Sequence, residues 1–290
     1  MRRSRFLFRL KELVPGEGDS DFRGCPPAGC KKSANYLQPE KMITVTGIST
    51  RRTSQQAASG NAAPAWPAVA GGVIWILATL QYGIVQAIVA GAWHHPPYSW
   101  LNNYISDLGN TVCGQFAVPH GTATYVCSPM HSTMNASFVV AGLLTIAGAI
   151  LLRRFWPQGR LATAALVLWV ITGLGKILVG LSPENKNVDL HLLGALNIPV
   201  GCIAILLLSM SVRQINRTVS IAGILLAILG LAGTVLSTAG QFGGSSLYLG
   251  LGVGGMERVS DYPASLWVLM IGIIAVLSAG TLVRQPTSRK

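Results

Sequence analysis

Residues 67–92 read PAVAGGVIWILATLQYGIVQAIVAGA, an apolar run without a charged side chain. A helix of about 20 apolar residues, with a range near 17–25, crosses the hydrocarbon core of a bilayer. A polar stretch, YSWLNNYISDLGN at residues 98–110, follows this run and contains Asp107. A carboxylate so close to a membrane span is costly unless it faces water, a partner or a site. We therefore expect residues 98–110 to form a loop at the membrane surface, around which the chain is organised.

Five more apolar runs follow, at about residues 132–152, 161–181, 190–210, 219–240 and 262–283. The runs are continuous and do not alternate as barrel strands do, which favours helices. Composition agrees, because 50% of the residues are hydrophobic and 11% are charged, against about 25% charged residues in soluble domains. The sequence predicts an all-α, polytopic membrane protein with a bundle of six transmembrane helices within residues 66–284.

The chain has a net charge of +12, and its basic residues lie mostly in the first tail and in the expected turns. Eleven of the 22 Lys and Arg residues lie in the first 52 positions, and most others lie between apolar runs. This is the placement of topology signals, so the lipid bilayer, and not nucleic acid, is the expected partner. With six spans, the basic turns and both chain ends share one side; the turn residues are Arg153, Arg154, Arg160, Arg213 and Arg217. We expect a protein of the cell membrane with both termini cytoplasmic.

Residues 1–65 are basic, lack the apolar content of a core and predict a disordered cytoplasmic tail. The tail either stays solvated or binds anionic lipid weakly, and a third reading is that translation starts at Met42, downstream of a gene-model extension. Cys25 and Cys30 are expected to be free thiols, because their spacing matches no metal knuckle. Residues 285–290 form a short cytoplasmic tail.

On this topology, the acids and histidines after the first tail all fall on the outer side. They are Asp107, Glu184, Asp189, Glu257, Asp261, His94, His95, His120, His131 and His191. An outward-facing polar site explains this asymmetry, and so does the collection of acids where basic residues are excluded. The first outer loop also carries Cys113 and Cys127, which an oxidising exterior favours as a disulfide, with two free thiols as the alternative.

Asp107 and Lys176 are the first candidate catalytic residues. Asp107 either belongs to a site or caps a short helix, since Ser106 and Asp107 are both good N-caps. Lys176 lies near the outer end of its span and either snorkels to the surface or points inward to a carboxylate such as Asp107. We favour the inward pairing, with His191 beside it and Arg258 at the mouth.

Asp189 and His191 begin the fourth span and are two further catalytic candidates. Two positions apart on a helix, they point to different faces, so they are not expected to form a relay with each other. His191 is interpreted as a hydrogen-bonded residue, a proton acceptor or a metal ligand. Zinc needs three or four ligands, and His120, His131, His191 and Asp107 could supply them, but their spacing does not require it. We expect no metal and no cofactor.

A Gly-rich segment at residues 240–255 precedes the last expected span. It lacks the Gly-Lys-Ser/Thr ending of a phosphate loop and predicts a flexible outer loop or lid that ends at Glu257 and Arg258. Arg258 is a candidate binding residue, because a guanidinium binds a lipid phosphate bidentately. The alternative is an Arg258 paired with Glu257 or Asp261.

Several strings occur in a characteristic order. They are NYISDLG at 103–109, Asn135 early in the second span, GLGK at 173–176, DLH at 189–191 and GMER at 255–258. This order resembles the prokaryotic six-span family called domain of unknown function 998, over about residues 66–283, and Ser106 and Asn135 within it are further candidate binding residues. The resemblance implies a six-span membrane protein and brings no established activity. More distantly, ISDLG is similar to the DRAM-like six-span proteins, some linked to lipid remodelling.

Two classes of function remain open from the sequence. One is a lipid-handling protein or hydrolase-like membrane enzyme, with a site near the outer leaflet that takes a lipid head group. The other is a non-catalytic membrane partner or sensor whose polar residues hold the bundle together. A small-solute transporter is less favoured, because it would place polar residues at mid-membrane. Side chains that converge on a cavity would favour the first class.

Overall fold

The computed structural model describes residues 66–121 and 123–283, with side chains up to residue 278. The expected tails, 1–65 and 285–290, lie outside the described residues, as do Cys25 and Cys30. The described chain is helical apart from one small hairpin and short connections.

Six helical segments are long and apolar enough to cross a membrane. Five are single helices: α1 (Trp66–Ala92), α2 (His131–Leu151), α3 (Arg160–Leu181), α6 (Arg217–Gly243) and α7 (Gly252–Val283). The remaining span is divided into α4 (Val188–Ala195) and α5 (Asn197–Val212). The predicted six-helix membrane bundle is confirmed.

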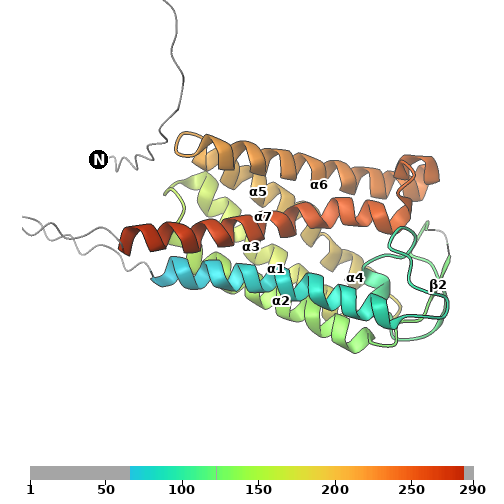
Figure 1. Ribbon diagram of the computed structural model, residues 1–290. Helices are drawn as coiled ribbons and strands as arrows, with labels where there is room; N and C mark the ends of the chain where they lie inside the picture. Colours follow the sequence, from blue (N-terminus) through green and yellow to red (C-terminus); the bar gives the residue numbers. More distant parts are fainter. Residues whose placement is uncertain (1–65, 122, 284–290) are drawn as a thin grey trace, which may run out of the picture. The chain divides into compact units, whose positions relative to one another are not determined.

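The helices form a closed ring in chain order (Figure 1). Each span packs on the next, and α7 returns to pack on α1. Where α7 packs on α1, a Cβ atom added to Gly72 would lie 2.7 Å from the carbonyl oxygen of Gly272. A Cβ atom added to Gly272 would likewise lie 2.7 Å from the carbonyl oxygen of Gly72. Two glycines therefore let α1 and α7 approach each other closely.

The ring has two chemically different ends. One end, which we call the arginine end, carries the α2–α3 and α5–α6 turns, with η2 (Leu152–Arg154) and the basic residues listed above. The other, which we call the loop end, carries the long connection between α1 and α2 and the start of α7. Within the described residues, the acids lie toward the loop end or on the helix turns next to it.

Pro199 accounts for the division of the fourth span. Proline lacks the N–H that would bond the carbonyl one turn earlier and its ring crowds that carbonyl, and the helix breaks at Leu196. The Asn197 side chain also bonds at the break, where its Nδ2 donates to the carbonyl oxygen of Gly194 at 2.8 Å. The break thus places an amide side chain inside the bundle.

A small lid covers the loop end. It contains η1 (Ser106–Gly109) and a hairpin of β1 (Gly114–Phe116) and β2 (Thr124–Val126), with Gln115 opposite Tyr125. A disulfide joins Cys113 to Cys127 at the base of the hairpin. We call residues 98–110 the cap loop.

The last span begins earlier than the sequence predicts. The helix α7 starts at Gly252, not near residue 262, and α6 continues to Gly243. Between them lies only a short connection with η3 (Ser245–Tyr248). The loop expected over residues 240–255 is therefore confined to residues 244–251, and Glu257, Arg258 and Asp261 lie on a helix.

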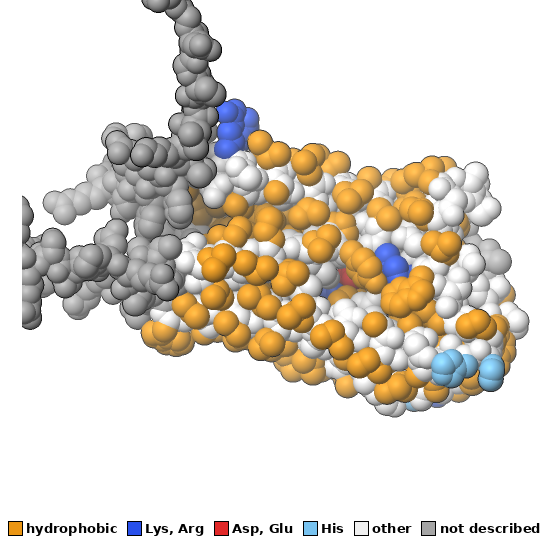
Figure 2. Space-filling view, viewed as in Figure 1, with side chains coloured by type: hydrophobic (Ala, Val, Ile, Leu, Met, Phe, Trp, Pro, Cys, Tyr) orange, Lys and Arg blue, Asp and Glu red, His pale blue; other side chains and the backbone are white. Residues whose placement is uncertain are grey.

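The apolar side chains face both inward and outward. Trp75, Trp169 and Trp267 are fully buried and fill the bundle toward the arginine end. Large apolar residues such as Leu77 and Leu225 are exposed on the sides, and Figure 2 shows apolar side chains spread over most of the visible face. This outer surface suits a hydrocarbon surrounding.

Candidate functional site

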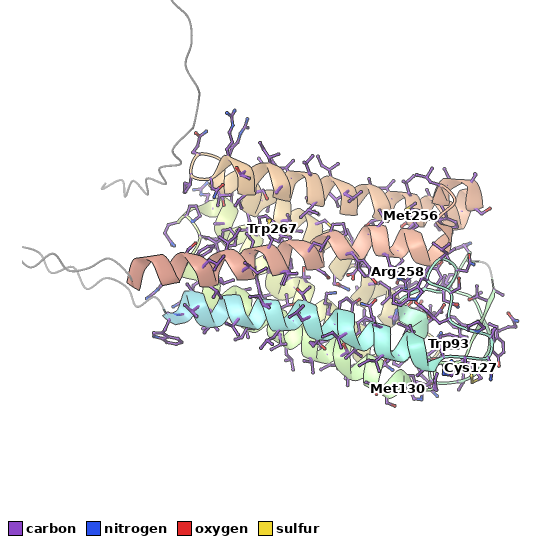
Figure 3. The ribbon with its side chains drawn as sticks, in the orientation of Figure 1. Trp93, Cys127, Met130, Met256, Arg258 and Trp267 are labelled. Atoms are coloured by element: carbon purple, nitrogen blue, oxygen red, sulfur yellow. A yellow bond between two sulfur atoms is a disulfide. The ribbon has the colours of Figure 1, made fainter. Side chains whose placement is uncertain are left out.

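Arg258 holds the cap loop onto the bundle. Its guanidinium donates to the backbone carbonyls of Trp100 at 2.9 Å, Asn103 at 3.1 Å and Gly254 at 2.7 Å. It also donates to the Tyr98 hydroxyl and lies over the rings of Tyr98 and Trp100. Figure 3 shows Arg258 on the part of α7 nearest the loop end.

Both sequence interpretations of Arg258 are wrong. The side chain is buried, with 8% of its surface exposed, so it is not at a mouth where it could take a lipid phosphate. It forms no ion pair with Glu257 or Asp261 in the described part of the chain. The cap loop explains why Arg258 is buried. A buried carbonyl needs a hydrogen-bond donor, and Arg258 supplies donors to carbonyls of this loop.

Asp107 is fully buried inside the cap loop. One carboxylate oxygen accepts from the backbone N–H of Tyr104 at 2.9 Å and from Asn103 Nδ2 at 3.2 Å. The other accepts from Asn110 Nδ2 at 3.5 Å. Ile105, and not Asp107, occupies the N-cap of η1, so the helix-cap interpretation does not apply and Asp107 instead folds the loop around itself.

Asn110 connects Asp107 to a second buried carboxyl, Glu184, in the turn between α3 and α4. Asn110 Nδ2 donates to Glu184 Oε1 at 2.8 Å. Burial, followed by the nearby charge of Asp107, raises the pKa of Glu184 well above its ordinary value. Burial also raises the pKa of Asp107, although hydrogen bonds from its neighbours hold it down. Two carboxyls so placed favour holding a proton between them.

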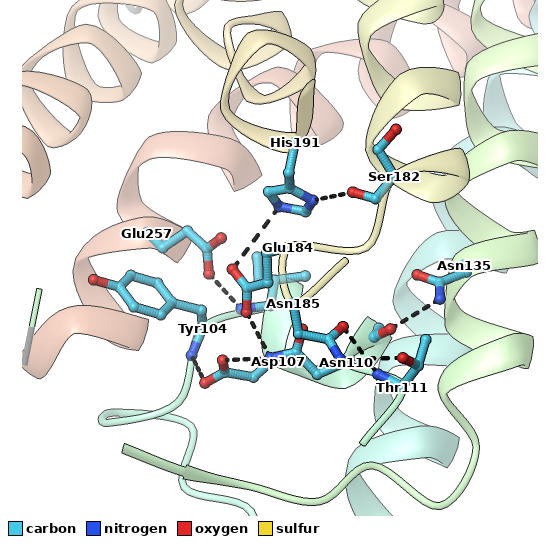
Figure 4. A network of polar contacts seen from close by, with 12 residues as sticks. Tyr104, Asp107, Asn110, Thr111, Asn135, Ser182, Glu184, Asn185, His191 and Glu257 are labelled. Atoms are coloured by element: carbon cyan, nitrogen blue, oxygen red, sulfur yellow. Dashed lines mark hydrogen bonds and ion pairs between the residues drawn. The ribbon is translucent and has the colours of Figure 1, made fainter. Parts of the chain in front are cut away.

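His191 continues this polar chain toward the bundle (Figure 4). Its Nε2 lies 4.0 Å from Glu184 Oε2, and its Nδ1 lies 2.9 Å from the carbonyl oxygen of Ser182. That carbonyl can only accept, so Nδ1 carries the proton and Nε2 faces Glu184.

Lys176 points inward, but not to Asp107. Its Nζ lies 3.2 Å from Asp261 Oδ1 and 4.5 Å from the centre of the Tyr82 ring. The expected Asp107–Lys176 pair is therefore wrong. Asp261 takes the place of Asp107, because the early start of α7 brings this acid inside the bundle opposite α3.

Lys176, Asp261 and His191, with their neighbours, surround a small cavity with two adjoining lobes. The lobe nearer the cap has a water-accessible volume of about 30 Å³, and the deeper lobe about 20 Å³. Tyr82, Lys176, Asn197 and Asp261 line both lobes. Ser106, His191 and Glu257 line the upper lobe, and Thr172 and Trp169 the lower one. We call this cavity the chamber.

The chamber has α1 and α7 on one side, with a narrow gap between these two helices. Thr79 Oγ1 donates to the carbonyl oxygen of Ser265 across this gap at 3.2 Å, and the Tyr262 hydroxyl donates to Gln86 Oε1 at 3.0 Å. Figure 2 shows acidic and basic atoms in a hollow of the otherwise apolar face over these two helices. Charged groups of the interior are thus reachable from the side of the bundle.

The remaining predicted residues lie apart from the chamber. Asp189 is exposed in the first turn of α4. Asn135 holds the cap loop, because its Nδ2 donates to the carbonyl oxygen of Gly109 at 2.9 Å. His120 lies against Phe242 and His131 contacts Ser132.

The four zinc ligands raised from the sequence therefore do not come together. In residues 66–121 and 123–278, no group of three or more His, Cys, Asp and Glu side chains is arranged to hold a metal ion.

Sequence reasoning missed Glu184, Glu257 and Asp261 as site residues, although it placed all three on the outer side. A signal was available for two of them, because Glu257 and Asp261 are four positions apart and share one helix face. Glu257 accepts a hydrogen bond from the Ile105 backbone N–H, and thereby ties the cap loop to the chamber.

The fold and the chamber define a class: a multi-pass helical membrane protein with ionisable side chains gathered inside the bundle. The chain belongs to the family described as Protein of unknown function (DUF998), whose model matches residues 69–274. The match covers the cap loop and every residue that lines the chamber. No curated protein and no solved structure matches the chain, so the more distant DRAM-like similarity stays a sequence expectation.

Proposed function

We propose that this protein handles lipid head groups at the outer leaflet of the cell membrane and that the chamber is its site. The observation that carries the proposal is convergence: Lys176, His191, Glu257 and Asp261 come from three spans and line one cavity. Ionisable residues inside membrane spans are costly and are therefore functional candidates. If these polar groups only stabilised the packing of the helices, they would not need to surround a cavity.

The proposed orientation places the loop end outside and both termini in the cytoplasm. The turns at the arginine end carry the basic residues, which stay in the cytoplasm. The disulfide between Cys113 and Cys127 lies at the loop end, and disulfides persist on the oxidising side of a membrane.

The packing below the chamber favours a site that opens to one leaflet over a transport path. Asp261 lies about 13 Å along α7 from its start, taking residues 252 to 261 at 1.5 Å each. That depth is just short of the midplane of a hydrocarbon core about 30 Å thick. Below the chamber, the buried Trp75, Trp169 and Trp267 fill the bundle. A head group that enters between α1 and α7 therefore does not continue to the arginine end.

Hydrolase-like chemistry is a second candidate, and the His191–Glu184 contact favours it. With its Nδ1 proton bonded to the Ser182 carbonyl, the imidazole presents Nε2 as a base. In this reading Nε2 of His191 takes a proton from a water in the upper lobe, and Glu184 stabilises the resulting imidazolium when it is ionised.

Lipid retention tests the proposal. Full-length protein is extracted into nanodiscs of mixed outer-leaflet lipids, and retained lipids are counted by native mass spectrometry after delipidation. We expect wild type to retain lipid and Asp261→Asn to lose it. Asp189→Asn is the matched control, because it removes an exposed acid that lies outside the chamber. Equal retention by all three folded proteins would overturn the proposal.

A further inference from the structure

The chamber has unmet hydrogen-bond acceptors. Asp261 Oδ2 and Asn197 Oδ1 are buried and have no hydrogen-bond partner among the described residues, and the same holds for Thr172 Oγ1. The three residues are 3%, 7% and 1% exposed, and all three line the deeper lobe. A buried acceptor without a donor is costly, so these atoms point to an occupant that donates.

The charge of the chamber points the same way. Glu257 and Asp261 bring two carboxyl groups, and Lys176 brings one ammonium that is already bonded to Asp261. Arg258 donates to the cap loop and Gly254, which leaves neither cation free for a phosphate. The chamber therefore offers carboxyl oxygens and no free cation, which suits an occupant that donates hydrogen bonds better than it suits an anion.

The walls also suit a small cation. The Tyr82 ring lies beside the lobes and already faces one ammonium, that of Lys176. Aromatic rings attract cations through the negative face of the ring. A water-accessible volume of about 20 Å³ holds roughly one or two water-sized groups. That space fits a CH₂–NH₃⁺ end and is too small for three methyl groups on nitrogen.

We propose that the chamber receives a primary ammonium group, with Asp261, Asn197 and Thr172 accepting its hydrogen bonds. This inference rests on the proposed lipid-handling function and names the substrate class of the same site. The ammonium belongs either to a lipid head group that enters between α1 and α7 or to a free amine.

The test compares phospholipids whose head groups carry a primary ammonium, a trimethylammonium or no ammonium. Wild-type protein in nanodiscs is offered phosphatidylethanolamine, phosphatidylcholine or phosphatidylglycerol with identical acyl chains, and free ethanolamine is offered separately. Retention is measured by native mass spectrometry. We expect phosphatidylethanolamine to be retained at least about tenfold better than phosphatidylcholine, because each charged hydrogen bond lost to methylation is worth about 1.5–3 kcal/mol.

Two variants locate the binding. Asp261→Asn should lower phosphatidylethanolamine retention about tenfold, and Thr172→Val about threefold, in line with charged and neutral hydrogen bonds. Thr172→Val keeps the side-chain shape and the ion pair, so it is informative even if Asp261→Asn fails to fold. Thr163→Val is the matched control, since Thr163 is exposed on the same helix, outside the chamber.

The outcomes separate the two proposals. Chamber-dependent retention of phosphatidylcholine or phosphatidylglycerol equal to that of phosphatidylethanolamine would refute the ammonium and keep lipid handling. Binding of free ethanolamine without retention of any lipid would keep the ammonium and refute lipid handling. Equal retention in wild type, Thr172→Val and Thr163→Val would show that only water occupies the chamber and would overturn the inference.

Discussion

The ion pair between Lys176 and Asp261 supports the sharpest prediction about stability. The Nζ and Oδ1 atoms are 3.2 Å apart, and the side chains are only 12% and 5% exposed. Removing one partner leaves the other charge buried and unpaired, which typically costs about 3–5 kcal/mol. Lys176→Met and Asp261→Asn should each lower the free energy of unfolding by about that amount.

The double variant should cost much less than the sum of the two single variants. Once both charges are gone, the remaining penalty is the loss of the Tyr82 contact and of packing, so we expect a coupling free energy of about 2–3 kcal/mol. Residues in direct contact show coupling of this size, whereas separated residues add within about 0.5 kcal/mol.

The assay is a double-mutant cycle on purified protein in one detergent, with unfolding followed by circular dichroism under increasing denaturant. The control cycle combines Lys176→Met with Asp107→Asn, which the structure places in different hydrogen-bond networks. That control should be additive. Additivity in the Lys176–Asp261 cycle, or strong coupling in the control, would refute the assignment of Asp261 as the partner.

Three further predictions concern Glu184, Arg258 and the topology. Because the folded pKa of Glu184 lies above its unfolded value, this carboxyl stabilises the fold below its ordinary pKa and loses that contribution as pH rises through the folded pKa. Glu184→Gln should therefore flatten the fall in melting temperature above pH 5, and an unchanged pH profile would contradict the raised pKa. Arg258→Lys should cost about 2–4 kcal/mol, because a lysine cannot reproduce the forked bonds to the cap-loop carbonyls; hydrogen exchange should rise first in the cap loop, and protection equal to wild type would show that the clamp is dispensable. A cysteine placed at Gln158 should react with a membrane-permeant reagent only, and one at Ser246 also with an impermeant reagent; labelling of Gln158 from outside would reverse the proposed topology.

Length and apolar composition determined the six spans, because the ability to cross a bilayer is a property of a continuous segment. The runs predicted at 132–152 and 161–181 coincide closely with α2 and α3. Even the divided fourth span has a local cause in Pro199, although the sequence reasoning did not use it.

The start of α7 could not be read from composition. Glu257, Arg258 and Asp261 lower the local hydropathy, so the sequence placed them in a loop before the span. In the structure their partners are Ile105, the cap-loop carbonyls and Lys176, which lie 85 or more positions away in the chain. Only tertiary contacts at that separation make charged residues acceptable inside a helix of the bundle.

The partner of Lys176 likewise depends on the tertiary structure. Sequence placed Asp107 and Lys176 at similar depth on the outer side, and depth alone cannot tell one carboxylate from another. The rotation of α7 against α3 decides that Asp261 faces Lys176, while the cap loop wraps its own N–H groups around Asp107. Sequence thus determined which residues are polar and at which end they lie. Packing decided which of them meet in the chamber, because the direction of a side chain depends on how its helix is turned against its neighbours.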